Sequence, residues 1–495
     1  MVKFTEKQFK DILEIGIMLA VEKNHNHLFG LILENAMTIT NCDGGTLYLA
    51  QEDSLAFKIM RTISMNVYEG SDGEIISLPP VPLREENVCA YSAIHRQTIN
   101  IQDVYHNEEF DFSGPKSYDS MTGYHTKSIL VIPLQNHENE LIGVLQLINA
   151  MDEQGNVIAF DPGFERIVLS LASQAAISIS NMRYIQEIKG LLYSFVEAMA
   201  TVVDRRTPYN ANHTRNVAMY ASEFVDYLNQ EHRSGRYREY FDSNRKEQLV
   251  LAASLHDIGK MTVPLSVMNK ATRLDSHLQE ILTRFELIRS YLKIDFYENR
   301  ISREECRQKL SYLDNAAVLV QKVNTLSILP KELEESVIEL SSHIYKKEDG
   351  EELPYLSKYE RDCLLIHRGT LTDEERKVME DHVVMTSRIL DNIHFNYHYR
   401  NVPLWAGSHH ELLDGSGYPM HLTAEQMPAE IRILALADIF DALTAKDRPY
   451  KEPVPLEEAL RILRDMAERG KLDQELVELF AGYARQNLRT VAGLL

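Results

Sequence analysis

The sequence has few cysteines and no excess of positive charge. Its four scattered cysteines form no CxxC pair and are Cys42, Cys89, Cys306 and Cys363. Such spacing predicts no disulfide framework and fits a reducing cytosol. Lysine and arginine total 52 against 73 aspartates and glutamates, a net charge of −21. This balance argues against binding to nucleic-acid polymers or anionic membranes, although a local basic pocket for a small phosphorylated ligand remains compatible with it.

Long hydrophobic runs are also missing. No stretch of about 18 uncharged apolar residues occurs, so we expect no segment inserted in a membrane. The first residues, MVKFTEKQFKDILEIG, alternate charged and apolar side chains, unlike a secretory signal peptide. Hydrophobic residues still make up 44% of the 495, and at about 150 residues per domain this length predicts two or three domains with sizeable cores. We therefore expect a soluble, cytoplasmic, multidomain protein.

The N-terminal part mixes helical and strand patterns. The predicted elements are a helix over 27–40, a strand over 45–50, a hairpin of β-branched runs over 127–134 and 140–150, and a helix over 164–182. This α+β order resembles a GAF domain, a sensory module, and we assign it residues 1–182.

Part of a ligand motif accompanies this resemblance. Asn149, Phe160 and Glu165 match positions associated with cyclic-nucleotide binding in GAF domains of mammalian phosphodiesterases. Ala150 and Phe164 replace the lysine and the aspartate of that motif. These departures argue against a cyclic-nucleotide ligand and leave the GAF ligand unknown. A domain that only packs and dimerises is the alternative.

A seven-residue repeat follows the GAF-like region. Apolar residues recur at spacings of three and four, namely Ile185, Ile188, Leu192, Phe195, Met199 and Val202. About three such heptads predict a linker helix over 183–204 that pairs with a second copy as a coiled coil. We therefore expect a homodimer, and the alternative is a helix packed on its own domain.

The remainder, 205–495, has helical periodicity and no strand signal of comparable strength. Amphipathic stripes predict helices over 276–296, 302–324 and 331–345. Thr372 and Glu375 form a capping box that begins a further helix. We therefore predict an all-α second half, joined to the α+β half by the long linker helix.

Histidines and aspartates interrupt otherwise apolar helical segments of this second half. A single histidine on an apolar face, such as His213 or His382, is usually a satisfied core residue. Asp438 and Asp441 lie in the apolar run IRILALADIFDALTA, where a buried carboxylate needs a cation. Together these positions supply five histidines, with at least two carboxylates from among three aspartates: His213, His256, His382, His409 and His410, with Asp257, Asp438 and Asp441. Imidazole and carboxylate suit first-row transition metals, and this set can hold two ions that activate a water for attack on a phosphodiester.

These residues carry a second resemblance. With the string His256-Asp257-Ile258-Gly259-Lys260, the triplet Gly417-Tyr418-Pro419 and the stretch 438–450, they resemble the HD-GYP family. Members of this family are helical enzymes of the HD superfamily that hydrolyse the bacterial second messenger cyclic di-GMP. The resemblance implies two divalent ions, iron or manganese, and the ligands that it implies are His213, His256, Asp257, His382, His409, His410 and Asp438.

Individual roles follow from the same resemblance. Asp257 would bridge the two ions, and a metal-bridging hydroxide would be the nucleophile that yields pGpG or GMP. Lys260 would contact the scissile phosphate. Arg448, Lys451 and Tyr418 would bind substrate.

Two departures from the family matter. Tyr209 replaces a glutamate that holds a third metal in some members, so two ions are expected. The distance from His256 to His382 is unusually long, which predicts a helical insertion at about 272–365. Such an insertion could be a lid, a dimer arm, a partner surface or a solvated decoration.

Three other functions are compatible with parts of this pattern. They are a catalytically silent cyclic-dinucleotide-binding or scaffold protein, a di-iron oxygenase, and a phosphodiesterase for cyclic GMP-AMP. The full ligand set argues against the first, and Lys260 with the Gly-Tyr-Pro loop argues against the second. No GGDEF sequence occurs, so synthesis of cyclic di-GMP is not predicted.

Overall fold

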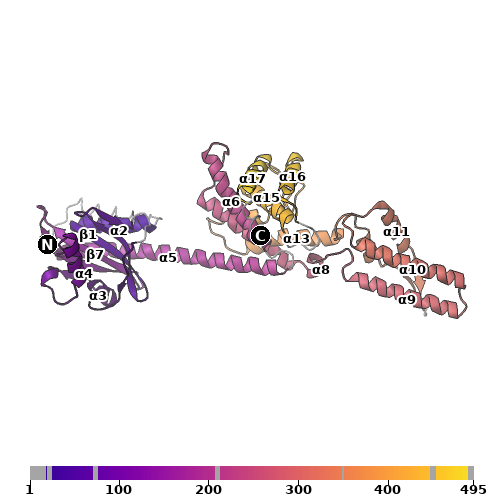
Figure 1. Ribbon diagram of the computed structural model, residues 1–495, viewed down its shortest axis with the longest axis horizontal. Coiled ribbons are helices and arrows are strands. Elements are labelled where there is room, and N and C mark those ends of the chain that lie inside the picture. The colour runs from indigo at the N-terminus through magenta and orange to yellow at the C-terminus, as the bar shows by residue number, and fades with distance from the viewer. Residues whose placement is uncertain are drawn as a thin grey trace. The chain divides into compact units, whose positions relative to one another are not determined.

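The computed structural model describes Met18 and residues 25–70, 76–206, 212–347, 350–445 and 453–488, except for the side chains of His25, Tyr118 and Arg166. It divides into two compact units, Met1–Leu192 and Tyr193–Leu495, which we describe separately (Figure 1). Within the described ranges, no helix combines the length and the apolar character needed to cross a membrane.

The first unit is built on an antiparallel sheet of eight strands. The strands are β1 (Cys42–Ala50), β2 (Ser54–Thr62), β3 (Val67–Glu69), β4 (Val81–Pro82), β5 (Ile99–Ile101), β6 (Ile129–Gln135), β7 (Leu141–Met151) and β8 (Val157–Ile158). The main path is β3-β2-β1-β7-β6-β5, with β4 beside β2 and β8 beside β7. The predicted hairpin is confirmed as β6 and β7, and the predicted strand over 45–50 lies within β1.

Helices cover both faces of this sheet. Their bounds are α2 (His25–Thr40), α3 (Val88–His95), the 3₁₀ turn η1 (Val104–His106), α4 (Ser113–Thr122) and the first part of α5 (Pro162–Arg205). Leu145 of β7 packs with α2 and α5, whereas its neighbour Val144 packs with α3. Successive strand residues point to opposite faces, so strands buried on both faces are mostly apolar, as β6 and β7 are apart from polar residues such as Gln146 and Asn149. Figure 1 shows α2 on one side of the sheet and α3 and α4 on the other.

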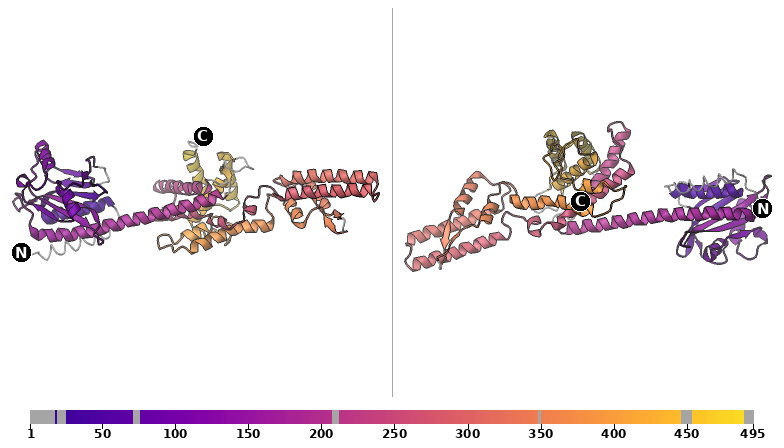
Figure 2. Two further views of the ribbon diagram at one scale, coloured as in Figure 1. Left: turned by 90° about the horizontal axis from the view of Figure 1, so that it is seen from below. Right: turned by 180° about the vertical axis from the view of Figure 1, so that it is seen from behind.

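Helix α5 is one continuous element from Pro162 to Arg205. It includes both the helix predicted over 164–182 and the linker helix predicted over 183–204. Its first turns complete the core of the GAF-like sheet through Val168, Leu171 and Ala172. Both views of Figure 2 show it as a single unbroken rod.

The second unit is mainly helical. Besides the end of α5 its elements are α6 (His213–Arg233), α7 (Ser243–Leu255), the 3₁₀ turn η2 (Ile258–Thr262), α8 (Leu265–Met268), α13 (Asp373–Asp391), α14 (Val402–Ala406), α15 (Ala429–Thr444), α16 (Leu456–Glu468) and α17 (Gln474–Asn487). Aromatic rings join α6, α15 and α17, because Phe480 lies 5.0 Å from both Phe224 and Phe440, centroid to centroid. The predicted capping box of Thr372 and Glu375 is present at the start of α13.

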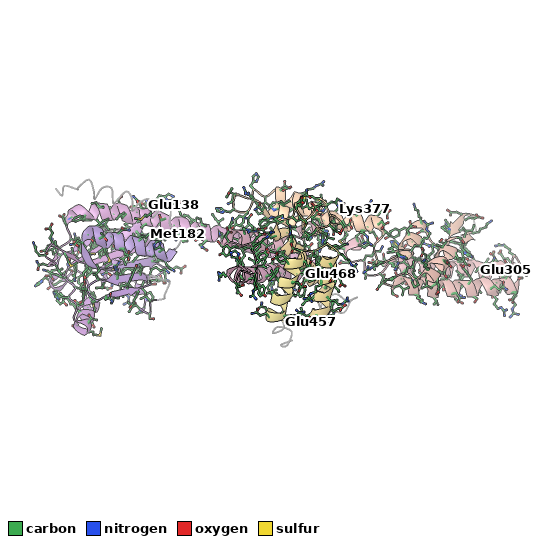
Figure 3. The ribbon with its side chains drawn as sticks, turned by 90° about the horizontal axis from the view of Figure 1, so that it is seen from above. Glu138, Met182, Glu305, Lys377, Glu457 and Glu468 are labelled. Carbon is green, nitrogen blue, oxygen red and sulfur yellow. The ribbon has the colours of Figure 1, made fainter. Side chains whose placement is uncertain are left out.

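Between α8 and α13 lies a segment with a hydrophobic core of its own. Its elements are α9 (His277–Tyr297), α10 (Arg303–Asn324), α11 (Lys331–Ser341), β9 (Ile344–Lys346), β10 (Glu352–Pro354) and α12 (Lys358–Leu364). Ile281, Phe285 and Val320 belong to its core. Charged residues such as Glu305 of this segment, and Glu457 of α16, point outward (Figure 3).

The helical prediction over 331–345 is wrong beyond Ser341. There the chain turns into β9, which pairs with β10 in an antiparallel hairpin. The Tyr345 and Tyr355 rings lie 6.3 Å apart across this hairpin. Strands of three residues are too short to show a period of two, so the sequence pattern of this half appears entirely helical.

Candidate metal centre

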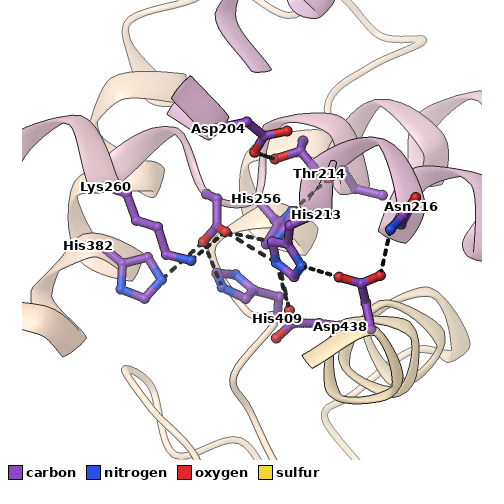
Figure 4. Close-up of polar contacts among 12 residues, drawn as sticks. Asp204, His213, Thr214, Asn216, His256, Lys260, His382, His409 and Asp438 are labelled. Carbon is purple, nitrogen blue, oxygen red and sulfur yellow. Dashed lines mark hydrogen bonds and ion pairs between the residues drawn. The ribbon is translucent and has the colours of Figure 1, made fainter. Parts of the chain in front are cut away.

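The candidate ligands come from five different places in the second unit. His213 is the first residue of α6, His256 and Asp257 directly follow α7, and His382 lies within α13. His409 and His410 follow α14, and Asp438 lies on α15. Figure 4 shows His213, His256, His382 and His409 turned toward one another.

These residues form three overlapping groups whose ligand atoms lie within 4.8 Å of one another. We call His213, His256 and Asp438 the first group, and His382, His409 and His410 the second group. The remaining group consists of His256, Asp257 and His409 and joins the other two.

Asp257 faces both groups, one carboxylate oxygen to each. Its Oδ2 lies 3.4 Å from Nε2 of His213 and 3.2 Å from Nε2 of His256. Its Oδ1 lies 3.4 Å from Nε2 of His382 and 3.9 Å from Nε2 of His409. A carboxylate placed in this way can bridge two cations.

Asp438 also faces a histidine of each group. Its Oδ1 is 3.2 Å from Nε2 of His213, and its Oδ2 is 3.6 Å from Nδ1 of His410. Burial opposes ionisation of Asp438, but the hydrogen bond and charge of His213 outweigh it and hold its pKa far below the ordinary value. Burial also opposes ionisation of Asp257, but the charges of His256 and Lys260 outweigh it and hold its pKa well below the ordinary value. Two carboxylates are therefore anionic inside a ring of imidazoles.

Several polar atoms of the centre are buried and have no hydrogen-bond partner among the described residues. They are Oδ1 of Asp257 and Nε2 of both His382 and His409. Leaving such an atom unsatisfied costs about 1–3 kcal/mol. One divalent cation among the three atoms would satisfy all of them, and imidazole nitrogen with carboxylate oxygen is a donor set that transition metals accept. The residues therefore fit a metal centre.

Two histidines of the second group, His409 and His410, favour the neutral form that binds metals. Burial, together with the neighbouring His410 and His256, holds the pKa of His409 well below its ordinary value. Burial likewise lowers the pKa of His410 to about 4, against the opposing charge of Asp438. Since a metal ligand must offer an unprotonated nitrogen, both histidines are ready to bind near neutral pH.

Glycine permits the close approach that completes the centre. A Cβ on Gly259 would overlap the backbone carbonyl of His382. The Gly259 amide donates to Oγ1 of Thr386 over 3.0 Å, and that hydroxyl donates to the carbonyl of His256 over 2.8 Å. The glycine of the His-Asp-Ile-Gly-Lys string thus lets α13 lie against η2 and brings His382 to Asp257.

Two predicted catalytic or substrate-binding residues lie beside the centre. Nζ of Lys260 is 2.6 Å from Oδ2 of Asp257, and its side chain keeps 18% of its surface exposed. The ring of Tyr418 lies 4.9 Å from that of His410, centroid to centroid. Arg448 and Lys451 lie outside the described residues, as does Tyr209.

The Gly-Tyr-Pro loop is held by a residue that the sequence analysis did not single out. Glu411 is fully buried and accepts hydrogen bonds from the backbone amides of Met420 at 2.6 Å and Leu422 at 2.8 Å. A Cβ on Gly417 would overlap the backbone of Glu411. Glu411 therefore fixes the loop that carries Tyr418, and its position directly after the histidine pair was the available sequence signal.

Comparison with known protein families agrees with this architecture. Residues 24–179 match the GAF domain, and residues 210–328 and 362–476 match two descriptions of the HD domain. The chain contains a GAF domain followed by HD domains. The predicted order of modules is thereby confirmed, and residues 329–361, between the two HD matches, lie within the predicted insertion.

Curated relatives match the HD part of the chain. A cyclic di-GMP phosphodiesterase of Thermotoga maritima is 41% identical over 120 residues, 24% of this chain and 32% of that protein. The cyclic di-GMP phosphodiesterase response regulator RpfG of Xanthomonas campestris is 42% identical over 111 residues, 22% of this chain and 28% of that protein. The 3'3'-cGAMP-specific phosphodiesterase 1 of Vibrio cholerae is 28% identical over 203 residues, 39% of this chain and 45% of that protein. The chain thus spans less than half the length of these curated relatives.

Proposed function

We propose that this protein is a metal-dependent phosphodiesterase that hydrolyses cyclic di-GMP to pGpG or GMP. The observation that carries the proposal is Asp257, whose two oxygens face two separate groups of histidines. The proposed division is a GAF sensory domain at 1–182, a linker helix at 183–204 and an HD-GYP catalytic domain at 205–495, with an insertion at about 272–365.

Two divalent ions, iron or manganese, are the proposed cofactors. His213, His256 and Asp438 would hold one, His382, His409 and His410 the other, and Asp257 both. When bound, such a pair supplies Lewis acidity and lowers the pKa of water near a phosphodiester.

The side chains around this pair have separate tasks. Lys260 brings a positive charge to the edge of the centre, where it can stabilise the charge that develops on a phosphate. Tyr418 presents an aromatic face beside His410, suited to stacking or to a hydroxyl hydrogen bond. We assign Arg448 and Lys451 to substrate phosphates on their charge and their place in the HD-GYP pattern.

Cyclic GMP-AMP is the second candidate substrate. It is favoured by the similarity to the 3'3'-cGAMP-specific phosphodiesterase. Both dinucleotides present the same phosphodiester backbone, so the metal centre alone does not separate them, and the choice rests on contacts to the bases.

One experiment tests the activity and its alternatives. The purified full-length protein, loaded with manganese or iron(II), is incubated with cyclic di-GMP or 3'3'-cyclic GMP-AMP, and the products are separated by chromatography. We expect linear dinucleotide or mononucleotide from at least one substrate. The Asp257→Ala variant should lose metal and activity together, because neither ion keeps its bridging ligand. Tight binding without turnover by a protein holding two ions would instead support the silent binding function.

A homodimer through α5 is part of the proposal. The predicted heptad positions Ile185, Ile188, Phe195 and Val202 have exposed fractions of 55%, 67%, 51% and 46%. An apolar stripe of this kind on one long helix is self-complementary, because two copies packed in parallel bury the same residues against each other. Since α5 begins in the GAF core and ends at the HD domain, a shift of the paired helices would let the GAF domain regulate hydrolysis.

A further inference from the structure

The histidines of the metal centre are oriented in two different ways. Nδ1 of His256, His382 and His409 lies 2.7, 2.6 and 2.7 Å from the carbonyl oxygen three residues earlier in the chain. Each of those carbonyls belongs to the helical turn that precedes or contains the histidine. A neutral carbonyl therefore fixes these three rings with Nε2 toward Asp257.

His213 has a charged partner instead. As the first residue of α6, it has no helical turn before it among the described residues, and its Nδ1 lies 2.7 Å from Oδ2 of Asp441. Asp441 is only 1% exposed. Its other oxygen, Oδ1, accepts a hydrogen bond of 2.9 Å from Nδ2 of Asn216. Asp441 is thus held in place by one residue of α6 while it orients another.

The spacing on both helices explains the arrangement. Asp438 and Asp441 are three residues apart on α15, and His213 and Asn216 are three residues apart on α6, so each pair lies on one helix face. Asp438 meets Nε2 of His213 at 3.2 Å, and Asp441 meets its Nδ1. The ring is therefore fixed from both sides by a single helix.

From this geometry we infer that Asp441 is a positioning residue that strengthens the first group as a metal site relative to the second group. This inference rests on the proposed metal centre. A carboxylate accepts the Nδ1 proton of His213 in a charge-assisted hydrogen bond, which fixes the tautomer and makes Nε2 a stronger donor than a histidine bonded to a carbonyl. The two ions would then differ in affinity, because only the first group contains a histidine that is oriented by a carboxylate.

The test measures metal affinity and not turnover. The full-length protein is loaded with manganese, titrated with a competing chelator and analysed for bound metal per chain. Asp441→Asn keeps the size of the side chain and removes its charge. We expect the affinity for one of the two ions to fall about 10–100-fold, while the other ion keeps its wild-type affinity.

Two further variants assign the affected ion. In a His382→Ala background the second group is broken, so the remaining ion should be the one that Asp441→Asn weakens. Glu430→Gln is the matched control, because Glu430 is a buried carboxylate on the same helix that pairs with Nε of Arg245 at 2.7 Å. This control should leave both affinities unchanged.

The outcomes separate this inference from the proposed function. If Asp441→Asn binds both ions with wild-type affinity, or loses affinity for both ions equally, the role of Asp441 is overturned and the proposed metal centre stands. A wild-type protein that binds no divalent ion would refute the proposed function itself. If Asp441→Asn does not fold, Asn216→Ala takes its place, because it removes the hydrogen bond that holds Asp441 and changes no proposed ligand. This variant should bind the same ion more weakly. Unchanged affinities for both ions would overturn the inference.

Discussion

Removal of divalent metal should destabilise the second unit and leave the first unit unchanged. Without a cation, Oδ1 of Asp257 and Nε2 of His382 and His409 are buried, and no described residue gives them a hydrogen bond. Among the described residues, the groups able to hold a metal all lie in the second unit. The GAF unit is therefore an internal reference in the same chain.

The size of the effect can be worked out in two ways. Three unsatisfied atoms at about 1–3 kcal/mol each give roughly 3–9 kcal/mol that bound ions would recover. By mass action, an ion at about 100 times its dissociation constant stabilises the folded state by about 2.7 kcal/mol, so two ions contribute about 5 kcal/mol. At about 2–4 °C per kcal/mol, the unfolding temperature of the second unit should fall by roughly 10–20 °C.

Scanning calorimetry of the full chain, with manganese and after chelation, measures this shift. We expect one transition to move and the transition of the GAF unit to stay in place. The Asp257→Ala variant should show no metal-dependent shift. The assignment of these residues as ligands would be refuted if the unfolding temperature of the second unit did not depend on metal. A metal-dependent shift that persists in Asp257→Ala would refute it as well.

Three other predictions concern single features of the molecule. Lys260→Ala should retain both ions and lose on the order of 2–4 kcal/mol of transition-state stabilisation, measured as a lower kcat. Replacing Leu192 and Phe195 together by glutamate should weaken the proposed dimer, because like charges then meet where the two α5 helices pack against each other. Light scattering measures this change. The insertion should lose stability below about pH 4.5: burial opposes ionisation of Glu360, but hydrogen bonds from Arg284 at 2.7 and 2.9 Å outweigh it and keep its pKa below the ordinary value. A carboxylate with a lowered folded pKa contributes its stabilisation above the unfolded pKa and loses it as the pH falls through the folded pKa.

Each of these predictions has a contrary outcome. Unchanged turnover in Lys260→Ala would remove that lysine from the site. A wild-type monomer at micromolar concentration would rule out the α5 dimer, and a dimer that tolerates both glutamates would place the interface on the GAF faces or the insertion. For the pH prediction, chemical unfolding of Glu360→Gln should show a weaker acid dependence than Glu305→Gln, whose carboxylate is exposed; equal profiles would contradict it.

The sequence by itself determined which residues form the candidate centre. One histidine in an apolar helical segment is usually a satisfied core residue. Several histidines together with aspartates, which are costly to bury alone, indicate a shared cation. Local patterns were sufficient for several long elements too: periodicity located α9 and α10, the capping box located the start of α13, and β-branched runs located β6 and β7. The nine-residue strand β2 was not predicted. Short edge strands such as β3, β5, β9 and β10 were missed because three residues carry too little periodicity.

The tertiary structure alone decided how these residues are paired. The spacing of Asp438 and Asp441 does not indicate that Asp438 faces Nε2 of His213 and Asp441 faces its Nδ1. That pairing depends on the packing of α6 against α15. In the same way, the need for glycine at position 259 comes from the approach of α13, which is distant in the chain. The sequence shows which buried polar side chains need a partner. Which residue becomes that partner depends on tertiary packing between segments that are distant in the chain.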